Sequence, residues 1–84
     1  ERHVIEASVL AREKELANRL VGTERVTNLE QVDGQVRFDF AGSPESIAGL
    51  HAELVREGFP LLWFREVEVT LEEAFFRITK GEVS

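Results

Sequence analysis

The stretch from Phe59 to Lys80 constrains the fold most, because its residue pattern changes period once, at Thr70. Pro60 opens a run of apolar, aromatic and β-branched residues that is typical of a strand. From Thr70 onward the apolar residues are spaced as on one face of a helix. They are Leu71, Ala74, Phe75 and Ile78. Thr70 and Glu73 form a capping box, so the stretch predicts a strand followed by a short amphipathic helix. Such a short helix is marginal alone in water, and we expect its stripe to be docked.

The chain before this stretch predicts three strands and two helices. In order they are a strand at His3–Ser8, a helix at Leu10–Val21, strands at Arg25–Val32 and Gln35–Ala41, and a helix from Ser43 to Gly58. Asp33-Gly34 between the second and third strands is a strong signal for a two-residue hairpin turn. Ser43 suits the N-cap of the second helix, and Pro44 suits its first position.

Alternation in two of the strands predicts a sheet with one buried side. In the first strand Ile5, Ala7 and Val9 oppose Val4, Glu6 and Ser8; in the third, Val36, Phe38 and Phe40 oppose Gln35, Arg37 and Asp39. The apolar residues of the second strand do not share one parity, so we expect a bulge or an edge position there.

The two helices before Phe59 each carry an apolar stripe. The stripes are Leu16, Ala17, Leu20 and Val21 in the first helix, and Ile47, Leu50, Leu54 and Val55 in the second. Gly22 is expected as a left-handed cap. Gly49 inside the second helix costs about 1 kcal/mol against alanine, which close packing on the sheet would explain.

This order of elements predicts one α+β domain over residues 1–84. Strand, helix, strand, strand, helix, strand is the βαββαβ order of a ferredoxin-like sandwich, with an antiparallel four-stranded sheet and two helices on one face. The C-terminal helix Thr70–Thr79 is an addition to this plan. A chain of 84 residues suffices for one thin core.

The end of the chain resembles the end of many bacterial ABC transporter ATP-binding subunits. That family ending reads roughly Ser/Thr-Leu-Glu-Glu/Asp-Val/Ala-Phe-x-x-Leu/Ile-Thr, and residues Thr70 to Thr79 fill each position. The motif residues are Thr70, Leu71, Glu72, Glu73, Phe75 and Ile78. Weaker similarities lie at Gly22–Val26, Ser43–Glu45 and Gly58–Pro60.

The resemblance implies a C-terminal accessory domain of an ATP-binding subunit of the drug-export or ABC-2 type. ATP, Mg²⁺ and hydrolysis would then belong to a domain upstream of Glu1, and we interpret the chain, which starts without methionine, as a fragment of that longer protein. The parent would pair with a permease, which places the domain in the cytoplasm at the inner face of the cell membrane. For the fragment itself we expect no direct membrane insertion.

No residue pattern in the chain predicts catalysis, a metal site or a bound cofactor. It has no cysteine and no GxxxxGK[ST] loop, and His3 and His51 have no cysteine to complete a zinc set. Acidic pairs such as Glu72-Glu73 and Glu66 with Glu68 are explained by capping and by an exposed strand face. We therefore expect a fragment that is not an enzyme.

Nucleic acid is not expected as a partner either. Phe38 and Phe40 lie on the third strand, where RNA-recognition modules present stacking residues, but the glycine-rich signature of those modules is missing. The formal net charge of −6 repels phosphate. We expect both phenylalanines in the core.

Four aromatic residues are candidates for protein contact. They are Trp63, Phe64, Phe75 and Phe76. Trp63 and Phe64 are adjacent on one strand and should point to opposite faces of the sheet. Two roles stay open for the domain: self-association or contact with the upstream ATPase, and a small-ligand sensor of the ferredoxin-like kind. The terminal helix could also bury these aromatics within the chain.

Overall fold

The computed structural model describes residues 2–68, which form four strands and two helices. Their bounds are β1 Arg2–Val9, α1 Glu13–Val21, β2 Val26–Val32, β3 Gln35–Ala41, α2 Pro44–Arg56 and β4 Leu61–Glu66. The predicted helix Thr70–Thr79 lies outside the described residues. The predicted order of the first six elements is confirmed.

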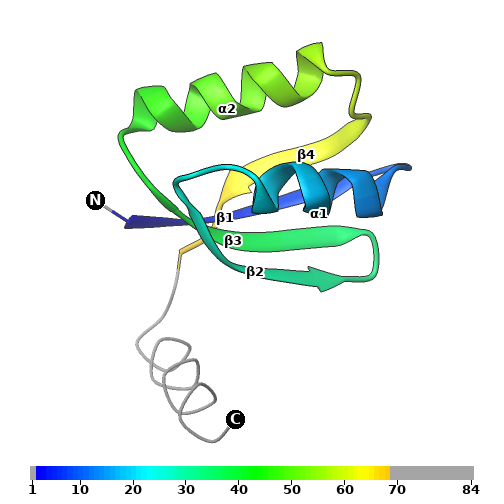
Figure 1. Ribbon diagram of the computed structural model, residues 1–84, viewed down its shortest axis with the longest axis horizontal. Helices are drawn as coiled ribbons and strands as arrows, with labels where there is room; N and C mark the ends of the chain where they lie inside the picture. The colour runs from blue at the N-terminus through cyan, green and yellow to red at the C-terminus, as the bar shows by residue number, and fades with distance from the viewer. Residues whose placement is uncertain (1, 69–84) are drawn as a thin grey trace, which may run out of the picture.

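The strands form one sheet in the order β2-β3-β1-β4, and every neighbouring pair is antiparallel (Figure 1). The two helices pack on one face, because their buried residues join a single apolar cluster with the same side of β1 and β3. The architecture is therefore α+β with a four-stranded antiparallel sheet and two helices, compatible with a ferredoxin-like fold.

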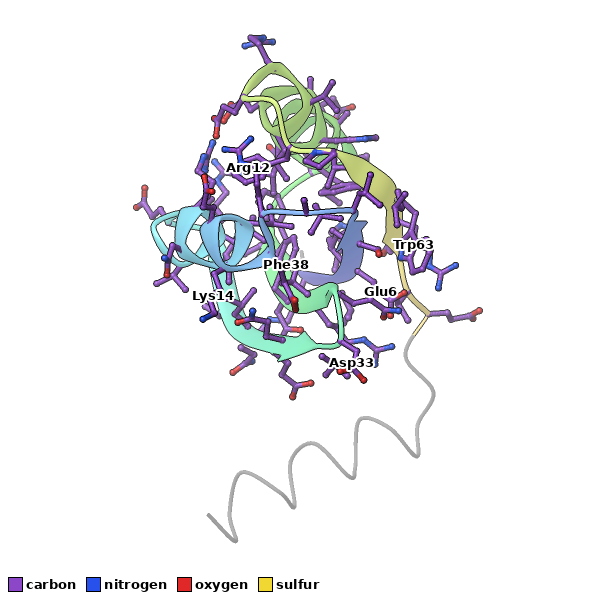
Figure 2. All side chains as sticks on the ribbon, turned by 90° about the vertical axis from the view of Figure 1, so that its right-hand side faces the viewer. Glu6, Arg12, Lys14, Asp33, Phe38 and Trp63 are labelled. Carbon is purple, nitrogen blue, oxygen red and sulfur yellow. The ribbon has the colours of Figure 1, made fainter. Side chains whose placement is uncertain are left out.

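The core consists of the predicted alternating residues of the two central strands. Ile5, Ala7 and Val9 of β1 and Val36, Phe38 and Phe40 of β3 are all buried, and Leu16, Leu20, Leu50 and Leu54 reach them from the helices. Figure 2 shows Phe38 between the sheet and α1. The prediction that Phe38 and Phe40 are core residues is confirmed.

Helix α1 is shorter than predicted. It begins at Glu13 rather than Leu10, because Arg12 adopts a left-handed φ of 66° and the amide of Leu10 donates to Pro60 O at 2.9 Å. The helix ends at Val21, whose side chain is exposed, so its place in the apolar stripe was wrong. Gly22 has a φ of −78° and is not a left-handed cap. Its amide instead continues the helical bonding to Asn18 O at 3.3 Å.

The hairpin between β2 and β3 turns at Asp33 and Gly34 as predicted. Both residues have positive φ, 37° and 78°, which a type I′ turn requires. β2 has the predicted irregularity, since its register with β3 shifts between Thr27 and Glu30 and Asn28 there has a φ of 53°. β2 is also an edge strand, so both alternatives for it hold.

Helix α2 begins and ends as predicted. Ser43 Oγ accepts from the Ser46 amide at 3.2 Å, Pro44 opens the helix, and Gly58 follows it with a φ of 89°. Val55 is exposed, so its assignment to the buried stripe was wrong; Leu50 and Leu54 alone are fully buried. Arg19 of α1 joins the helices by donating to Glu53 and Glu57 at 2.8 Å each.

Gly49 does not mark a close approach of α2 to the sheet. A Cβ at this position would meet nothing within 4 Å, so the proposed packing reason was wrong. We expect Gly49→Ala to raise the free energy of unfolding by about 0.5 to 1 kcal/mol, because alanine restricts the unfolded chain and favours the helix. Urea unfolding followed by circular dichroism measures this. The neighbouring, exposed Ala48→Gly is the matched control and should lower stability by a similar amount. A destabilised Gly49→Ala would contradict the open space around α2.

Candidate functional site: the helix-free face of the sheet

The side of the sheet opposite the two helices carries polar residues from the central strands. β1 contributes Val4, Glu6 and Ser8 to this helix-free face, and β3 contributes Gln35, Arg37 and Asp39, as their alternation predicted. Figure 2 shows Glu6 and Trp63 on the opposite side of the sheet from Phe38 and α1. Glu6, Ser8 and Asp39 are buried although neither α1 nor α2, the helices of residues 2–68, covers this side of the sheet.

One row of side chains crosses all four strands with alternating charge. Glu30 of β2 is in register with Arg37 of β3, Arg37 with Glu6 of β1, and Glu6 with Arg65 of β4. We call Glu30, Arg37, Glu6 and Arg65 the charge row. Opposite charges on adjacent strands are a stabilising cross-strand arrangement. The row therefore ends in an acidic residue at the β2 edge of the sheet and in a basic residue at the β4 edge.

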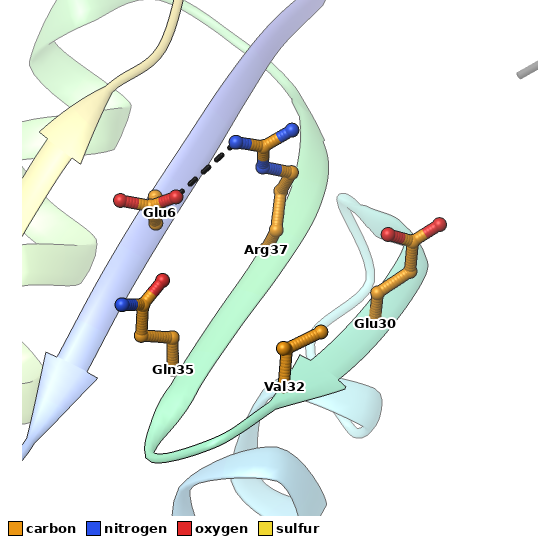
Figure 3. A pocket seen from close by; sticks show the side chains of 5 residues that line it. All are labelled: Glu6, Glu30, Val32, Gln35 and Arg37. Carbon is orange, nitrogen blue, oxygen red and sulfur yellow. Dashed lines mark hydrogen bonds and ion pairs between the residues drawn. The ribbon is translucent and has the colours of Figure 1, made fainter. Parts of the chain in front are cut away.

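Glu6 is the centre of this row and is only 7% exposed. Arg65 donates to Glu6 Oε1 from Nη2 at 2.7 Å and from Nε at 3.2 Å. Arg37 Nη2 donates to Glu6 Oε2 at 3.2 Å, and Figure 3 shows this contact. Trp63 Nε1 donates to Oε1 at 3.3 Å. The hydrogen bond from Arg65 lowers the pKa of Glu6 most, burial opposes it, and Arg37 lowers it further. The carboxylate is thus ionised at neutral pH and is suited to hold arginines rather than to transfer protons.

Trp63 and Val32 are the exposed apolar side chains beside the charge row. Trp63 is 37% exposed, and the Arg65 guanidinium lies 5.2 Å from its ring centroid. Val32, 61% exposed, helps line a shallow hollow of about 200 Å³ with Glu6, Glu30, Gln35 and Arg37 (Figure 3). The hydrogen bond to Glu6 and the contact with Arg65 fix the indole on the surface. These features make this part of the face a candidate interaction surface.

Asp39 is satisfied by the bulge in β2. Asn28, the left-handed residue of the bulge, donates from Nδ2 to Asp39 Oδ2 at 2.7 Å. Ser8 Oγ donates to Gly34 O at 3.3 Å. Among residues 2–68 no buried side-chain nitrogen or oxygen lacks a hydrogen-bond partner. The buried polar side chains of this face therefore all have hydrogen-bond partners within the chain, which holds this part of the surface in one arrangement.

Two of the four predicted contact residues lie on opposite faces of the sheet, as predicted. Trp63 lies on the helix-free face, in register with Ser8, whereas Phe64 is in register with the core residue Ala7 and stacks on His51 with ring centroids 4.5 Å apart. Phe75 and Phe76 lie outside the described residues, as do the motif residues Thr70, Leu71, Glu72, Glu73 and Ile78. Of the four aromatics, the structure therefore describes Trp63 and Phe64, and these two do not share a face.

Sequence reasoning did not single out Glu6, Arg37 and Arg65 as functional residues. Their strand positions were visible, and alternation placed Glu6 and Arg37 on the polar side. The signal that unites them is the register between β1, β3 and β4, which the sequence does not specify.

The histidines take part in structural contacts. His3 Nδ1 lies 2.6 Å from Glu66 Oε2 at the start of β1, and His51 lies against Phe64. Within residues 2–68 there is no group of three or more histidine, cysteine, aspartate or glutamate side chains placed to hold a metal ion.

A second hollow lies between α2 and the loop from α1 to β2. It measures about 320 Å³. Its lining comprises Thr23, Glu24, Arg25, Phe40, Ser46, Gly49, Leu50 and Glu53. Gly49 leaves space in its wall. Arg25 Nη1 donates to Ser46 Oγ across it at 3.3 Å. A hollow of this volume is at the lower end of the range of ordinary small-molecule pockets.

Comparison of the chain with protein-family models, with curated proteins and with solved structures gives no match. No helix among the described residues is both long and apolar enough to cross a membrane. A functional assignment must therefore be argued from the residues and the geometry above.

Proposed function

We propose that this chain is a non-catalytic C-terminal accessory domain of a bacterial ABC transporter ATP-binding protein. Its role is contact between subunits, or regulation of the upstream ATPase by contact. The resemblance of residues Thr70 to Thr79 to the family ending supports the family. The α+β sandwich of residues 2–68 is compatible with the ferredoxin-like domain that this resemblance implies.

The observation that carries the contact role is the helix-free face. It has no covering helix among the described residues, and it presents Trp63 in a fixed position next to a preformed charge row. Half-exposed tryptophan and arginine side chains are the residue types that most often dominate binding energy at protein interfaces. Glu6 is ionised and bound by two arginines, so this face favours recognition over proton-transfer chemistry.

The resemblance to the family implies further properties, which we include in the proposal. The sandwich is ferredoxin-like, and the segment Thr70–Thr79 adds a helix to it. ATP and Mg²⁺ bind to the upstream domain, and the permease meets the domain only through the parent. The parent transporter holds the domain at the inner face of the cell membrane.

A small-ligand sensor is the second candidate, and the hollow beside Gly49 favours it. Its volume of about 320 Å³ is at the lower end of ordinary ligand pockets. The two candidates differ in their response to additives. A ligand at one hundred times its Kd raises the free energy of unfolding by about 2.7 kcal/mol, whereas a contact domain responds to its own concentration or to a protein.

The direct test is removal of residues 1–84 from the parent ATP-binding protein. We expect dimerisation of the ATP-binding subunits to weaken at least about tenfold, since a tethered second contact raises the effective concentration of the first. ATP hydrolysis should change with it, whereas ATP binding to a single subunit should not. Sedimentation velocity and a steady-state ATPase assay measure these quantities.

A pair of point variants in the same parent serves as the control. Trp63→Ala should reproduce part of the loss, and Val55→Ala, the truncation of a more exposed apolar side chain on α2, should not. Unchanged dimerisation and ATPase activity after removal of the domain would refute the contact role. A parent without an upstream GxxxxGK[ST] loop would refute the family.

A further inference from the structure

We propose that the helix-free face binds a second copy of this chain, around a two-fold axis that runs parallel to the strands between β1 and β3. This inference rests on the proposed contact function and identifies its surface and its partner. The two sheets then pack face to face in the aligned arrangement of β-sandwiches, about 10 Å apart.

The charge row is complementary to itself under this symmetry. Its order across the sheet is Glu30, Arg37, Glu6, Arg65, and a two-fold axis along the strands reverses that order in the second copy. Glu30 then faces Arg65 of the second copy, and Arg37 faces Glu6. The two-fold axis forms each of these pairs twice, and all four pairs have opposite charges. This holds because the charges alternate along a row of four, so that reversing the row exchanges the acidic and basic positions.

The neighbouring row is complementary in the same way. It consists of Val32, Gln35, Ser8 and Trp63, again one residue from each strand. Reversal places Trp63 against Val32 of the second copy, and Gln35 against Ser8. The two exposed apolar side chains of the face thus bury each other, and the two polar side chains between them can hydrogen-bond.

The alternative face-to-face arrangement has its two-fold axis perpendicular to the strands. With that axis over the charge row, Glu30 faces Glu30, and each arginine faces its own copy. Like charges placed directly opposite one another cost free energy at an interface. The charge row therefore selects the axis parallel to the strands.

The charge balance of the face also fits a second copy. The chain carries a formal net charge of −6, so two copies repel each other in most orientations. The helix-free face is an exception. Its charged residues are Glu6, Glu30, Asp39, Arg2, Arg37 and Arg65, with equal numbers of each sign.

The size of the face predicts a weak dimer. Strands about 4.8 Å apart that rise about 3.3 Å per residue give a face of roughly 20 by 20 Å. Two such faces bury on the order of 800 to 1,000 Å², below the roughly 1,200 to 2,000 Å² of standard stable interfaces. The isolated chain should therefore dimerise only at high concentration, and tethering to the parent should strengthen the contact.

The test is a charge exchange in the 84-residue chain, followed by sedimentation equilibrium at low salt. Wild type should show a concentration-dependent monomer–dimer equilibrium. Glu30→Arg places arginine against Arg65 of the second copy, and Arg65→Glu places glutamate against Glu30. Each variant alone should dimerise at least about tenfold more weakly than wild type. An equimolar mixture of the two should form heterodimers with near wild-type affinity, because both facing pairs are again opposite in charge.

Two charge-matched controls lie away from the face. Glu24→Arg, in the loop before β2, repeats the first charge change, and Lys14→Glu, on α1, repeats the second (Figure 2 shows Lys14 on the opposite side from Trp63). Neither variant should change the affinity of the dimer beyond the effect of the altered net charge of the chain. Restored association in the mixture also excludes misfolding of Arg65→Glu, since an unfolded chain would not pair.

Three outcomes would overturn the inference. A wild-type chain that stays monomeric at millimolar concentration would rule out both this dimer surface and self-association. Contact with the upstream ATPase would then still be tested by removal of the domain from the parent. A dimer whose affinity changes neither in the single variants nor in their mixture would exclude this face but leave self-association intact. A complex between wild type and Glu30→Arg that is stronger than the wild-type dimer would indicate the perpendicular axis instead, because Glu30 would then face the introduced arginine.

Discussion

Phe38→Ala should remove a large share of the stability of the folded chain. Phe38 is 0% exposed at the middle of β3, in register with Ile5 and within the cluster that both helices complete. Truncation of such a phenylalanine costs about 3 to 5 kcal/mol, from lost burial and from the cavity that remains. A domain of this size has about 4 to 12 kcal/mol of stability in total. Urea unfolding at pH 7 followed by circular dichroism should show the transition midpoint moving to much lower urea.

The control for this experiment is an apolar truncation that creates no cavity. Val55→Ala in α2 removes an exposed side chain and should change the free energy of unfolding by less than about 0.5 kcal/mol. Phe38→Leu, which keeps most of the volume, should fall between the two and still fold. An unchanged midpoint for Phe38→Ala would mean that the core does not centre on this residue.

Local sequence patterns predicted most of the fold of residues 2–68, because each depends on neighbouring residues. The alternation around Phe38 marked the buried side of β3, Asp33-Gly34 located the hairpin, and Ser43 located the start of α2. The errors were also local. Val21 and Val55 lie one position beyond a buried leucine, where the helix surface already turns toward solvent.

The candidate site was less accessible to sequence reasoning. The sequence predicted that Trp63 and Phe64 point to opposite faces of the sheet, which is confirmed, but not which of the two lies on the helix-free face. The charge row could not be predicted, because Glu30, Arg37, Glu6 and Arg65 meet only through the register of three strand pairs. A shift of β4 by one residue would remove Arg65 from Glu6 and turn Trp63 toward the core. The bulge at Asn28 sets the register of β2 in the same way.

Glu6→Gln should destabilise the chain at neutral pH and reduce its sensitivity to acid. Glutamine keeps the shape of the side chain but cannot balance Arg37 and Arg65. Hydrogen bonds to charged groups are worth about 1.5 to 3 kcal/mol. The arginines reach solvent, with side chains 34% and 61% exposed, so the loss should be about 1 to 3 kcal/mol rather than the larger cost of breaking a fully buried pair.

The acid sensitivity follows from the lowered pKa of Glu6 in the folded chain. A carboxyl whose folded pKa is below its unfolded value contributes stability above the unfolded pKa, near 4.3, and loses it as the pH falls through the folded pKa. Wild type should therefore lose stability below about pH 4 more steeply than Glu6→Gln does. Some acid slope should persist in both, because the hydrogen bond from Arg19 also lowers the pKa of Glu57.

Urea unfolding of dilute wild type and Glu6→Gln between pH 3 and pH 7 measures both effects, since dilution keeps the chain monomeric. Glu30→Gln is the matched control, because it removes an exposed acid from the same charge row. It should change stability by less than about 0.5 kcal/mol at every pH. The difference between wild type and Glu6→Gln should shrink toward acid pH, as protonation of Glu6 produces the same neutral side chain in wild type. If the difference in the free energy of unfolding stays constant from pH 7 to pH 3, the contribution of the arginine contacts does not depend on the charge of Glu6. The four residues of the charge row would then be neighbours in the sheet whose ion pairs do not stabilise this face.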